Sequence, residues 1–313
     1  MADAYDAVRE MGARVSNWGR WGDDDEMGTL NLITPEARLR GATSVRAGKA
    51  FTLGIRFGAD GPQPDPSPIG RYNPRHTMLA TGASWGDPPV FHYSDDAIDL
   101  PTQSATQWDS LAHVHYDGKL YNGYPADEVL GDDGAARDGI DKQARQAFAT
   151  RGVLLDVARL KGVDRLEPST LITPEDLDAA AAAQGVSIEP GDVLLIRTGH
   201  ITTFTEDGDL NVFNWQCPGV GLAAAAWFRE RDLAAVAADT PNVEVLPGED
   251  PEVISPAHLA CIRDMGMPFG EIFDLQALGA DCAEDGQWDF LFVAQPLEIT
   301  GGIGSPINPI AVK

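Results

Sequence analysis

From residue 150 onward, short apolar runs of strand length alternate with segments that carry helix signals. The clearest apolar runs are residues 152–160, 192–199, 233–241, 270–278 and 289–299. Strands that alternate with helices predict an α/β fold built on a buried sheet. Frequent Gly and Pro between the elements disfavour a simple doubly wound sheet.

Two helix starts are marked in this part of the chain. Thr173 is a suitable N-cap, and Pro174 suits the first helical position after it. The pair Ser255-Pro256 predicts the start of another helix, which carries His258 in its first turn.

The first hundred residues are rich in Gly, Pro and Asp and lack clear periodicity. Residues 59–72 and 83–95 are predicted as exposed loops. Long loops of this kind either act as lids or binding loops or are simple surface excursions, and both interpretations stay open. We expect one domain over residues 1–313, with an irregular N-terminal extension of about residues 1–100 packed on it.

The chain carries 48 acidic and 23 basic residues, a formal net charge of −25. This surface repels phosphate groups, so we expect neither nucleic-acid nor membrane binding. No apolar run reaches the length of a membrane span, and the N-terminal segment lacks the apolar core of a secretory signal. Three cysteines without a metal-binding spacing fit a reducing compartment. We therefore expect a cytoplasmic protein.

The densest polar cluster precedes the α/β part of the chain. If residues 103–109 are extended, Gln103, Gln107 and Asp109 share one face, because side chains alternate along a strand. A turn after Asp109 would bring His113 back to the same point. An imidazole, a carboxylate and an amide oxygen can bind one divalent metal and leave room for water. The alternative is an edge strand whose polar residues face solvent.

A second candidate cluster combines His258 with Glu271, which lies in an otherwise apolar run. A carboxylate buried in such a strand is costly unless it has a partner, and a metal ion would be one. The alternative is a surface histidine and an edge glutamate.

The apolar run 233–241 ends with the sequence Ala-Asp-Thr-Pro, which contains Asp239. Catalytic loops often follow strands at such positions. The alternative is an Asx-type turn that stabilises the chain reversal.

Five aromatic residues are candidates for the wall of a substrate pocket, since their side chains combine large apolar area with specific geometry. They are Trp18, Trp21, Trp108, Phe213 and Trp215. For any single one of them, ordinary core packing is the better interpretation.

The first polar cluster resembles the HxGTHxDxPxH signature of the cyclase family, which includes bacterial kynurenine formamidase and isatin hydrolase. The signature positions are held here by Gln103, Ala105, Thr106, Gln107, Asp109, Leu111 and His113. The threonine, the aspartate and the last histidine match. Glutamine replaces the two earlier histidines, and Ala and Leu replace Gly and Pro.

Other segments resemble the family in the same order along the chain. They are NWGRWGDDDEMGTLNLITPE, GDVLLIRTGH, CPGVGLAAAAWF, ADTPNVEV and GGIGSPINPIAV. His258 and Glu271 fall where the family has its later histidine and its metal-binding glutamate.

The resemblance implies a swivelling β/β/α domain with a barrel-like core flanked by helices, assembled as a homodimer or homotetramer. It implies a metal site formed by Gln107, Asp109, His113 and Glu271. His258 would be the general acid/base, and Glu271 would serve catalysis as well as metal binding. Because an amide is a weaker ligand than an imidazole, we expect one divalent ion, manganese or zinc.

The expected function is metal-dependent hydrolysis of an amide, cyclic amide or lactone in a small, cyclic or aromatic substrate, through metal-activated water. Gln103 and His115 join the five aromatic residues as expected substrate contacts. Two alternatives stay open: a metal-assisted cyclase or dehydratase of secondary metabolism, and a non-catalytic small-molecule binding protein with a decayed site. Two acidic residues and two histidines remain at the family's site positions, which disfavours a decayed site.

Overall fold

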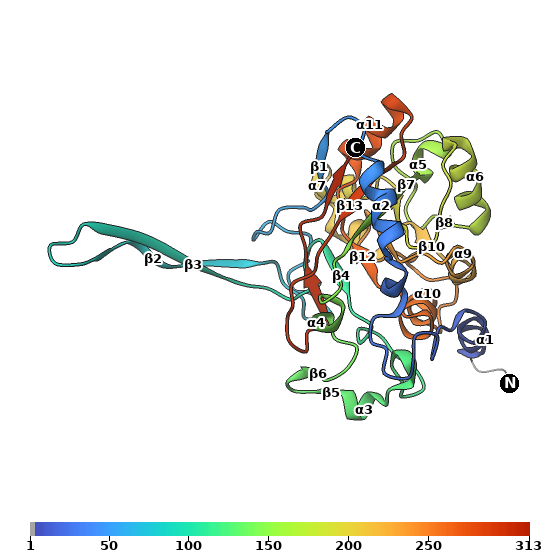
Figure 1. The fold of residues 1–313 in the computed structure, drawn as a ribbon, viewed down its shortest axis with the longest axis horizontal. Helices are drawn as coiled ribbons and strands as arrows, with labels where there is room; N and C mark the ends of the chain where they lie inside the picture. The colour runs from blue at the N-terminus through green and yellow to red at the C-terminus, as the bar shows by residue number, and fades with distance from the viewer. Residues whose placement is uncertain (1–3) are drawn as a thin grey trace.

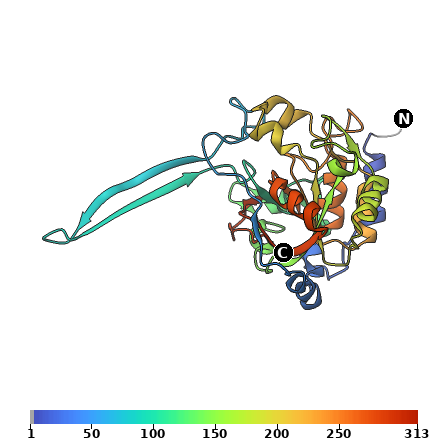
Figure 2. The ribbon, with the colours of Figure 1, turned by 90° about the horizontal axis from the view of Figure 1, so that it is seen from above.

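A computed structural model describes residues 4–313 and has a nine-stranded mixed sheet at its centre (Figure 1). The sheet curls strongly into a half-barrel that is flanked by helices (Figure 2). In spatial order its strands are β1 (Ala50–Thr52), β15 (Ile310–Val312), β13 (Asp289–Val293), β7 (Ala149–Asp156), β9 (Val193–Arg197), β11 (Ala235–Ala238), β12 (Phe269–Glu271), β4 (Gln107–Asp109) and β14 (Gly304–Pro306). The predicted α/β class with a barrel-like core is confirmed.

The central strands β7, β9, β11 and β12 are parallel, and the strand pairs on either side of them are antiparallel. Their side chains alternate between two apolar cores, because successive residues of a strand point to opposite faces. Leu154 and Leu195 pack into one core, whereas Val153, Leu155 and Leu194 pack into the other. Burial of each such side chain contributes about 1.5–3 kcal/mol to folding.

Helices cover the sheet and connect its strands. Those before the central strands are α1 (Asp6–Val15), α2 (Pro35–Thr43), α3 (Ala126–Val129) and α4 (Ile140–Gln143). The later ones are α5 (Val157–Leu160), α6 (Pro174–Gln184), α7 (Ile201–Thr205), α8 (Leu210–Trp215), α9 (Ala224–Glu230), α10 (Pro256–His258), the π-helix η3 (Leu259–Met265) and α11 (Gln276–Asp285). Within residues 4–313, no helix has the length and apolar character needed to cross a bilayer.

The helix α6 begins as predicted from the sequence. Thr173 accepts a hydrogen bond from the Asp176 backbone N–H, and the Asp176 carboxylate accepts one from the Thr173 N–H. This reciprocal pair satisfies donors that would otherwise be unpaired at the helix start. Gly185 ends the helix with a φ of 64°, a conformation that favours glycine.

Residues 83–95 were predicted as a loop, and this prediction is wrong. They belong to a hairpin of β2 (Arg75–Trp85) and β3 (Phe91–Asp99) that projects far from the body, and we call residues 75–99 the arm (Figures 1 and 2). The two strands pair with each other instead of with the main sheet, so they lack the apolar pattern of a buried strand. Residues 59–72 form a loop, as predicted.

Three predicted strand lengths also need correction. The run 270–278 is a strand only to Glu271, because Ile272 adopts a left-handed φ of 59° and α11 starts soon after. The run 152–160 ends as a strand at Asp156, whose side chain caps α5. The run 289–299 is a strand only to Val293.

Candidate metal centre

Strands β4 and β12 bring three polar side chains to one face of the sheet. Glu271 lies opposite Gln107 in the antiparallel register, and the Gln107 Nε2 donates a hydrogen bond of 2.8 Å to Glu271 Oε2. Asp109 lies two residues beyond Gln107 and therefore points to the same face. The sequence prediction depended on an extended conformation for residues 103–109, but residues 103–106 form a turn and bends, so only residues 107–109 are a strand.

His258 approaches this face from the end of α10. Its Nε2 lies 3.3 Å from Glu271 Oε1. One ligand atom from each of Asp109, His258 and Glu271 lies within 4.8 Å of the other two, and all three residues are buried. Among residues 4–313, this is the one group of three or more such side chains close enough to share a metal ion.

His113 completes the cluster from the turn after β4. The His113 N–H donates a hydrogen bond to the Ser110 carbonyl, which closes the predicted turn. The imidazole Nε2 then lies 3.8 Å from Asp109 Oδ1. The structure thus brings Gln107, Asp109, His113 and Glu271 together, with His258 beside them.

Several polar atoms of this cluster are buried and have no hydrogen-bond partner within residues 4–313. They are both carboxylate oxygens of Asp109, Oε1 of Gln107 and Nδ1 of His113. Buried polar atoms in native proteins almost always have a partner, and an unpaired buried carboxylate is especially costly. A divalent cation accepts carboxylate, amide oxygen and imidazole donors, so these residues fit one.

The electrostatics of the cluster also suit a cation. Burial raises the pKa of Asp109 well above its ordinary value, and the nearby Glu271 carboxylate adds to the rise, while His258 and Arg71 oppose it. Burial lowers the pKa of His113 to about 3, with help from the positive charges of Arg71 and His258. His113 is therefore neutral at physiological pH, which is the state in which an imidazole binds a metal.

Glu244 orients His258, and sequence reasoning missed this residue. Its Oε2 accepts hydrogen bonds from His258 Nδ1 at 3.0 Å and from the His258 N–H at 3.1 Å, and its Oε1 accepts one from the Ala257 N–H. Burial alone would lower the pKa of His258, but the hydrogen bonds to Glu244 and Glu271 raise it to about 10. A carboxylate in this position fixes both the angle and the tautomer of the ring.

This helix starts at Pro256, as the pair Ser255-Pro256 predicted, but its N-terminal hydrogen bonds come from another residue. Ser255 has a left-handed φ of 50°, and its side chain forms no capping hydrogen bond within the described part of the chain. Glu244 binds the free N–H groups of the first turn instead. A sequence signal for Glu244 exists: it is a glutamate between Val243 and Val245, much as Glu271 is a glutamate in an apolar strand.

The helix that carries His258 continues as the π-helix η3. Wide π-helical turns are rare and frequently occur at functional sites. Gly266 ends this segment with a left-handed φ of 69°, and an added Cβ there would collide with the Tyr121 ring at 2.4 Å. The close contact leaves no room for any side chain at this position.

An open cavity of about 540 Å³ lies beside His113. His113 and His115 line it, together with Tyr116, Ile254 and Leu259. Its size matches pockets that bind small molecules. The structure therefore places His115, a predicted substrate contact, beside a proposed metal ligand and in contact with solvent.

Two of the predicted aromatic wall residues belong to the core instead. Trp108 is fully buried, stacks on Phe148 with ring centroids 4.6 Å apart, and donates its indole N–H to the Ala294 carbonyl. It lies between Gln107 and Asp109 on β4, so alternation turns it to the opposite face. Phe213 is also fully buried. Neither side chain can form the wall of an open pocket.

The other predicted substrate contacts are placed as follows. Trp18 donates its indole N–H to the Arg263 carbonyl at 2.9 Å, and the Arg263 guanidinium lies 4.5 Å from its ring. Trp21 packs beneath Arg20. Trp215 ends α8 with 40% of its surface exposed. No contact joins these three tryptophans to the metal centre in the described residues, and their role in substrate binding stays a prediction.

Gln103 lies against the strand that flanks the cluster. Its Nε2 is buried without a hydrogen-bond partner among residues 4–313. Gly304 pairs with Asp109 across β14 and β4, and a Cβ added at Gly304 would lie 2.6 Å from this nitrogen. The glycine therefore leaves space for the Gln103 amide near Asp109.

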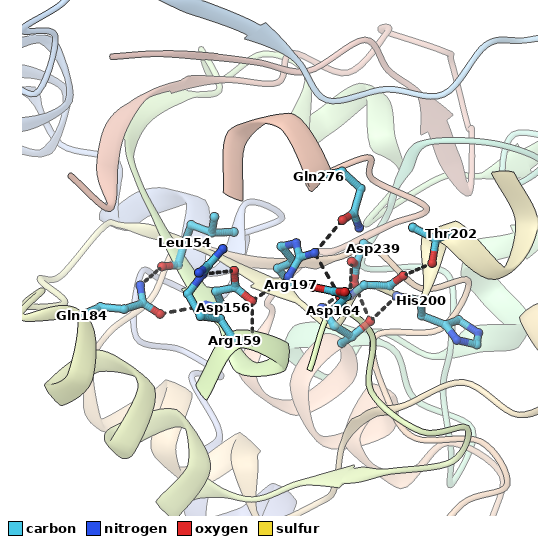
Figure 3. Close-up of polar contacts among 12 residues, drawn as sticks. Leu154, Asp156, Arg159, Asp164, Gln184, Arg197, His200, Thr202, Asp239 and Gln276 are labelled. Atoms are coloured by element: carbon cyan, nitrogen blue, oxygen red, sulfur yellow. Dashed lines mark hydrogen bonds and ion pairs between the residues drawn. The ribbon is translucent and has the colours of Figure 1, made fainter. Parts of the chain in front are cut away.

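Asp239, the remaining candidate, has a structural role. It is fully buried, and its carboxylate accepts hydrogen bonds from the Thr198 N–H and hydroxyl and from the Gly199 N–H (Figure 3). The same view shows the buried ion pair of Arg197 with Asp156, whose Nη1 and Oδ1 are 2.8 Å apart. These contacts join the ends of β7, β9 and β11, so Asp239 holds the turn after β9 and is not free for catalysis.

Known proteins similar to this chain share its fold. The sequence model of the family described as "Putative cyclase" matches residues 52–245. A crystal structure described as a novel cyclase is 39% identical, with a TM-score of 0.88, and the match covers 96% of this chain and 99% of that chain. No functionally curated protein matches the sequence significantly.

Two more distant structures have the same fold. Isatin hydrolase A from Ralstonia solanacearum is 18% identical with a TM-score of 0.61, over 84% of this chain and 91% of that chain. A predicted metal-dependent hydrolase from Bacillus stearothermophilus is 17% identical with a TM-score of 0.54, over 84% and 97%.

Proposed function

This chain belongs to the cyclase family, and on that premise we propose that it is a metal-dependent hydrolase. The observation that carries the proposal is the buried Asp109 carboxylate, which has no hydrogen-bond partner in residues 4–313 and lies beside His258 and Glu271. The printed names of the distant structural relatives, an isatin hydrolase and a predicted metal-dependent hydrolase, support the same reaction class.

The proposed ligands are Gln107 through its amide oxygen, Asp109, His113 and Glu271. Oxygen and nitrogen donors of this kind suit zinc or manganese, and we propose one ion. When bound, the ion would supply Lewis acidity and lower the pKa of a water molecule toward neutrality.

The chain's own residues would position the substrate and move the proton. His258 is held by Glu244 through Nδ1, so its Nε2 faces the cluster, and because both ring nitrogens donate hydrogen bonds the ring would deliver a proton first and take it back afterwards. Glu271 accepts hydrogen bonds from both Gln107 and His258 and keeps the two aligned. The cavity beside His113 and His115 would admit a small, cyclic or aromatic amide, cyclic amide or lactone.

Location is a further part of the proposal. All three cysteines are free and buried. Unpaired thiols fit a reducing compartment, which supports the proposed cytoplasmic location.

A metal-assisted cyclase or dehydratase is the second candidate, and the descriptions of the matched family and of the 39%-identical structure favour it. It would use the same residues without consuming water. A binding protein with a decayed site is disfavoured, because decay would leave no reason for the proposed ligands to stay in contact.

Elemental analysis of the purified protein tests the metal. We expect about one equivalent of zinc or manganese per chain, and its loss in Asp109→Asn. The metal-loaded protein is then offered cyclic amides, N-formyl aromatic amides and aromatic lactones in ¹⁸O-labelled water. Incorporation of one ¹⁸O into the product supports hydrolysis, whereas unlabelled cyclised or dehydrated product supports the second candidate. Wild-type protein that binds neither metal under any loading condition would overturn both.

A further inference from the structure

Two side chains near the metal centre carry hydrogen-bond donors that have no partner within the chain. One is the Gln103 amide, whose Nε2 is buried without a partner among residues 4–313. The other is the guanidinium of Arg71, which is half-buried. Within the described part of the chain, every other arginine has an ion pair, a side-chain hydrogen bond or a ring contact, and Arg71 has none. Unused donors in such surroundings indicate a ligand, because buried polar groups otherwise find a partner.

The Gln103 donor lies on the same face of the sheet as the proposed metal ligands. Gly304 of β14 pairs with Asp109 of β4, and residues directly opposite in an antiparallel pair point to one face. A Cβ added at Gly304 would lie 2.6 Å from Gln103 Nε2, so the amide occupies the space over that face beside Asp109. The Thr102 hydroxyl donates a hydrogen bond of 2.9 Å to Gln103 Oε1. The amide oxygen is thus occupied, while its N–H donors stay free.

This donor lies to one side of the proposed ion and not at it. In the sheet, β4 stands between β12 and β14. The proposed ligands Gln107, Asp109 and Glu271 come from β4 and β12, whereas Gly304, against which Gln103 lies, belongs to β14. A group bound by Gln103 would therefore be a second feature of the substrate, next to the bond that is cut.

The loop that carries Arg71 is tied to the turn that carries Gln103. The Gln63 N–H donates to Asn73 Oδ1, and Asn73 Nδ2 donates back to the Gln63 carbonyl, which closes the loop two residues beyond Arg71. Gln63 is buried, and its Nε2 donates a hydrogen bond of 3.0 Å to the carbonyl of Ser104, which directly follows Gln103. Arg71 is therefore placed by a fixed loop root.

The charge of Arg71 acts on the metal centre. It opposes the rise in the pKa of Asp109 and adds to the fall in the pKa of His113, so the guanidinium lies near both residues. One divalent ion would neutralise Asp109 and Glu271, which leaves the positive charge of Arg71 without a counter-charge. A half-buried, unbalanced cation in a chain with a formal net charge of −25 favours an anionic ligand.

We propose that Arg71 and Gln103 form a subsite for a carboxylate group of the substrate, beside the bond on which the centre acts. This inference rests on the proposed function and narrows its substrate class to amides or lactones that carry a carboxylate next to the scissile group. A guanidinium donates two parallel N–H bonds to a carboxylate, and an amide N–H can bind a further lone pair. One cation and one amide suit the single charge of a carboxylate better than the higher charge of a phosphate ester.

A matched pair of probes tests the subsite by binding. The first, ortho-formamidobenzoate, has an aromatic formamide and a neighbouring carboxylate, and the second, ortho-formamidobenzamide, has a neutral amide of the same size in place of the carboxylate. Calorimetry on the metal-loaded protein should show at least about tenfold tighter binding of the carboxylate probe, as expected for hydrogen bonds to a charged group. Arg71→Gln should remove this preference and leave the affinity for the neutral probe nearly unchanged. Gln103→Leu should reduce the preference less, because it removes no charge.

Three further measurements isolate the guanidinium. Metal content is determined for each variant, because direct binding of the carboxylate to the ion would survive in Arg71→Gln, whereas binding at the subsite would not. Arg71→Lys should restore part of the preference, since it keeps the charge but loses the two parallel donors. The matched control is Arg75→Gln, whose guanidinium lies 4.2 Å from the centre of the Tyr72 ring, and it should bind both probes as the wild type does.

Hydrolysis of the probes, followed in the same samples, separates this proposal from the proposed function. Arg71-dependent binding without hydrolysis would count against the hydrolase and support the subsite. Hydrolysis without any preference for the carboxylate probe would support the hydrolase and overturn the subsite. Absence of carboxylate binding, or an unchanged preference in Arg71→Gln, would overturn the subsite as well.

Discussion

The strands β2 and β3 of the arm have eleven and nine residues, whereas β4 and β12 of the metal centre have three each. Yet all six residues of β4 and β12, the short pair, are buried, whereas almost all residues of β2 and β3, the long pair, are exposed. The short pair is fixed by neighbours on both faces and both edges. Length therefore does not decide how firmly a strand pair is held in this molecule. Burial does, and the chain keeps its ligands where burial is complete.

The largest effect is expected when one aspartate in each of the two strand pairs is replaced by alanine. Asp109→Ala should abolish both metal binding and activity, because it removes a buried carboxylate that no other group replaces. The control Asp96→Ala removes an exposed aspartate from the arm and should keep both. Elemental analysis and turnover measure the two effects. Retention of a full equivalent of metal in Asp109→Ala would remove Asp109 from the ligand set.

Next in size is the proton-transfer residue. His258→Ala should lower turnover by about 10²–10⁴-fold, the usual contribution of a general acid/base. Metal content should stay near the wild-type value, because His258 is assigned to the proton and not to the ion. His115→Ala, in the wall of the cavity beside His113, should lower turnover less. Loss of metal in His258→Ala would make His258 a metal ligand instead. Loss of metal in His115→Ala would make His115 a ligand, and the proposed ligand set would have to be reassigned.

Glu244 should have a smaller effect, because it acts through His258. Glu244→Gln should lower kcat by about 10–100-fold, as is usual for residues that orient a catalytic or ligand group. Metal content and KM should change little, and Glu244→Asp should restore part of the rate. The exposed Glu252→Gln is the control. A change in KM alone would show that Glu244 does not orient His258.

The smallest expected effect comes from replacing Asp138, and it changes stability instead of activity. Burial, with Glu26 and Asp25 nearby and only Arg137 opposing them, raises its pKa to about 8. A raised pKa means that the folded state holds the proton more tightly, so the free energy of unfolding falls as pH rises from about 4 to about 8.

Asp138→Asn removes this titration and tolerates the left-handed φ of 58° at that position. The variant should be more stable than wild type by about 1–3 kcal/mol at pH 8, the usual cost of an unsatisfied buried polar group, with little difference near pH 4. Urea unfolding across this pH range measures it, with the exposed Asp133→Asn as the control. An equal increase in the free energy of unfolding at both ends of this pH range would show that the titration of Asp138 is not the cause.

The sequence predicted those parts of the fold that depend on local pattern. The apolar runs that form β7, β9 and β11 are buried, as expected for strands at the centre of a sheet. Thr173 caps α6 through a capping box whose two residues are close in the sequence, so the sequence alone predicts it. The arm was missed because its residues pair only with each other. β-Branched residues are few there, and Gly, Ala and Asp are many, so no apolar alternation marks the strands.

The metal centre depends on contacts between distant parts of the chain. Alternation along residues 107–109 was enough to put Gln107 and Asp109 on one face, and it should also have placed Trp108 in the core. The pairing with Glu271 came from a family resemblance, since no spacing rule links residues so far apart. Glu244 was missed because its contact with His258 forms only when a loop folds back onto the helix start.

The register between β4 and β12 has a consequence for how this segment tolerates change. An insertion of one residue beside Trp108 would turn either Gln107 or Asp109 toward the core, because side chains alternate with a period of two. Substitutions keep the alternation and insertions do not. Protein engineers who wish to alter the chemistry of this chain should therefore replace residues in β4 one for one and confine length changes to the turns.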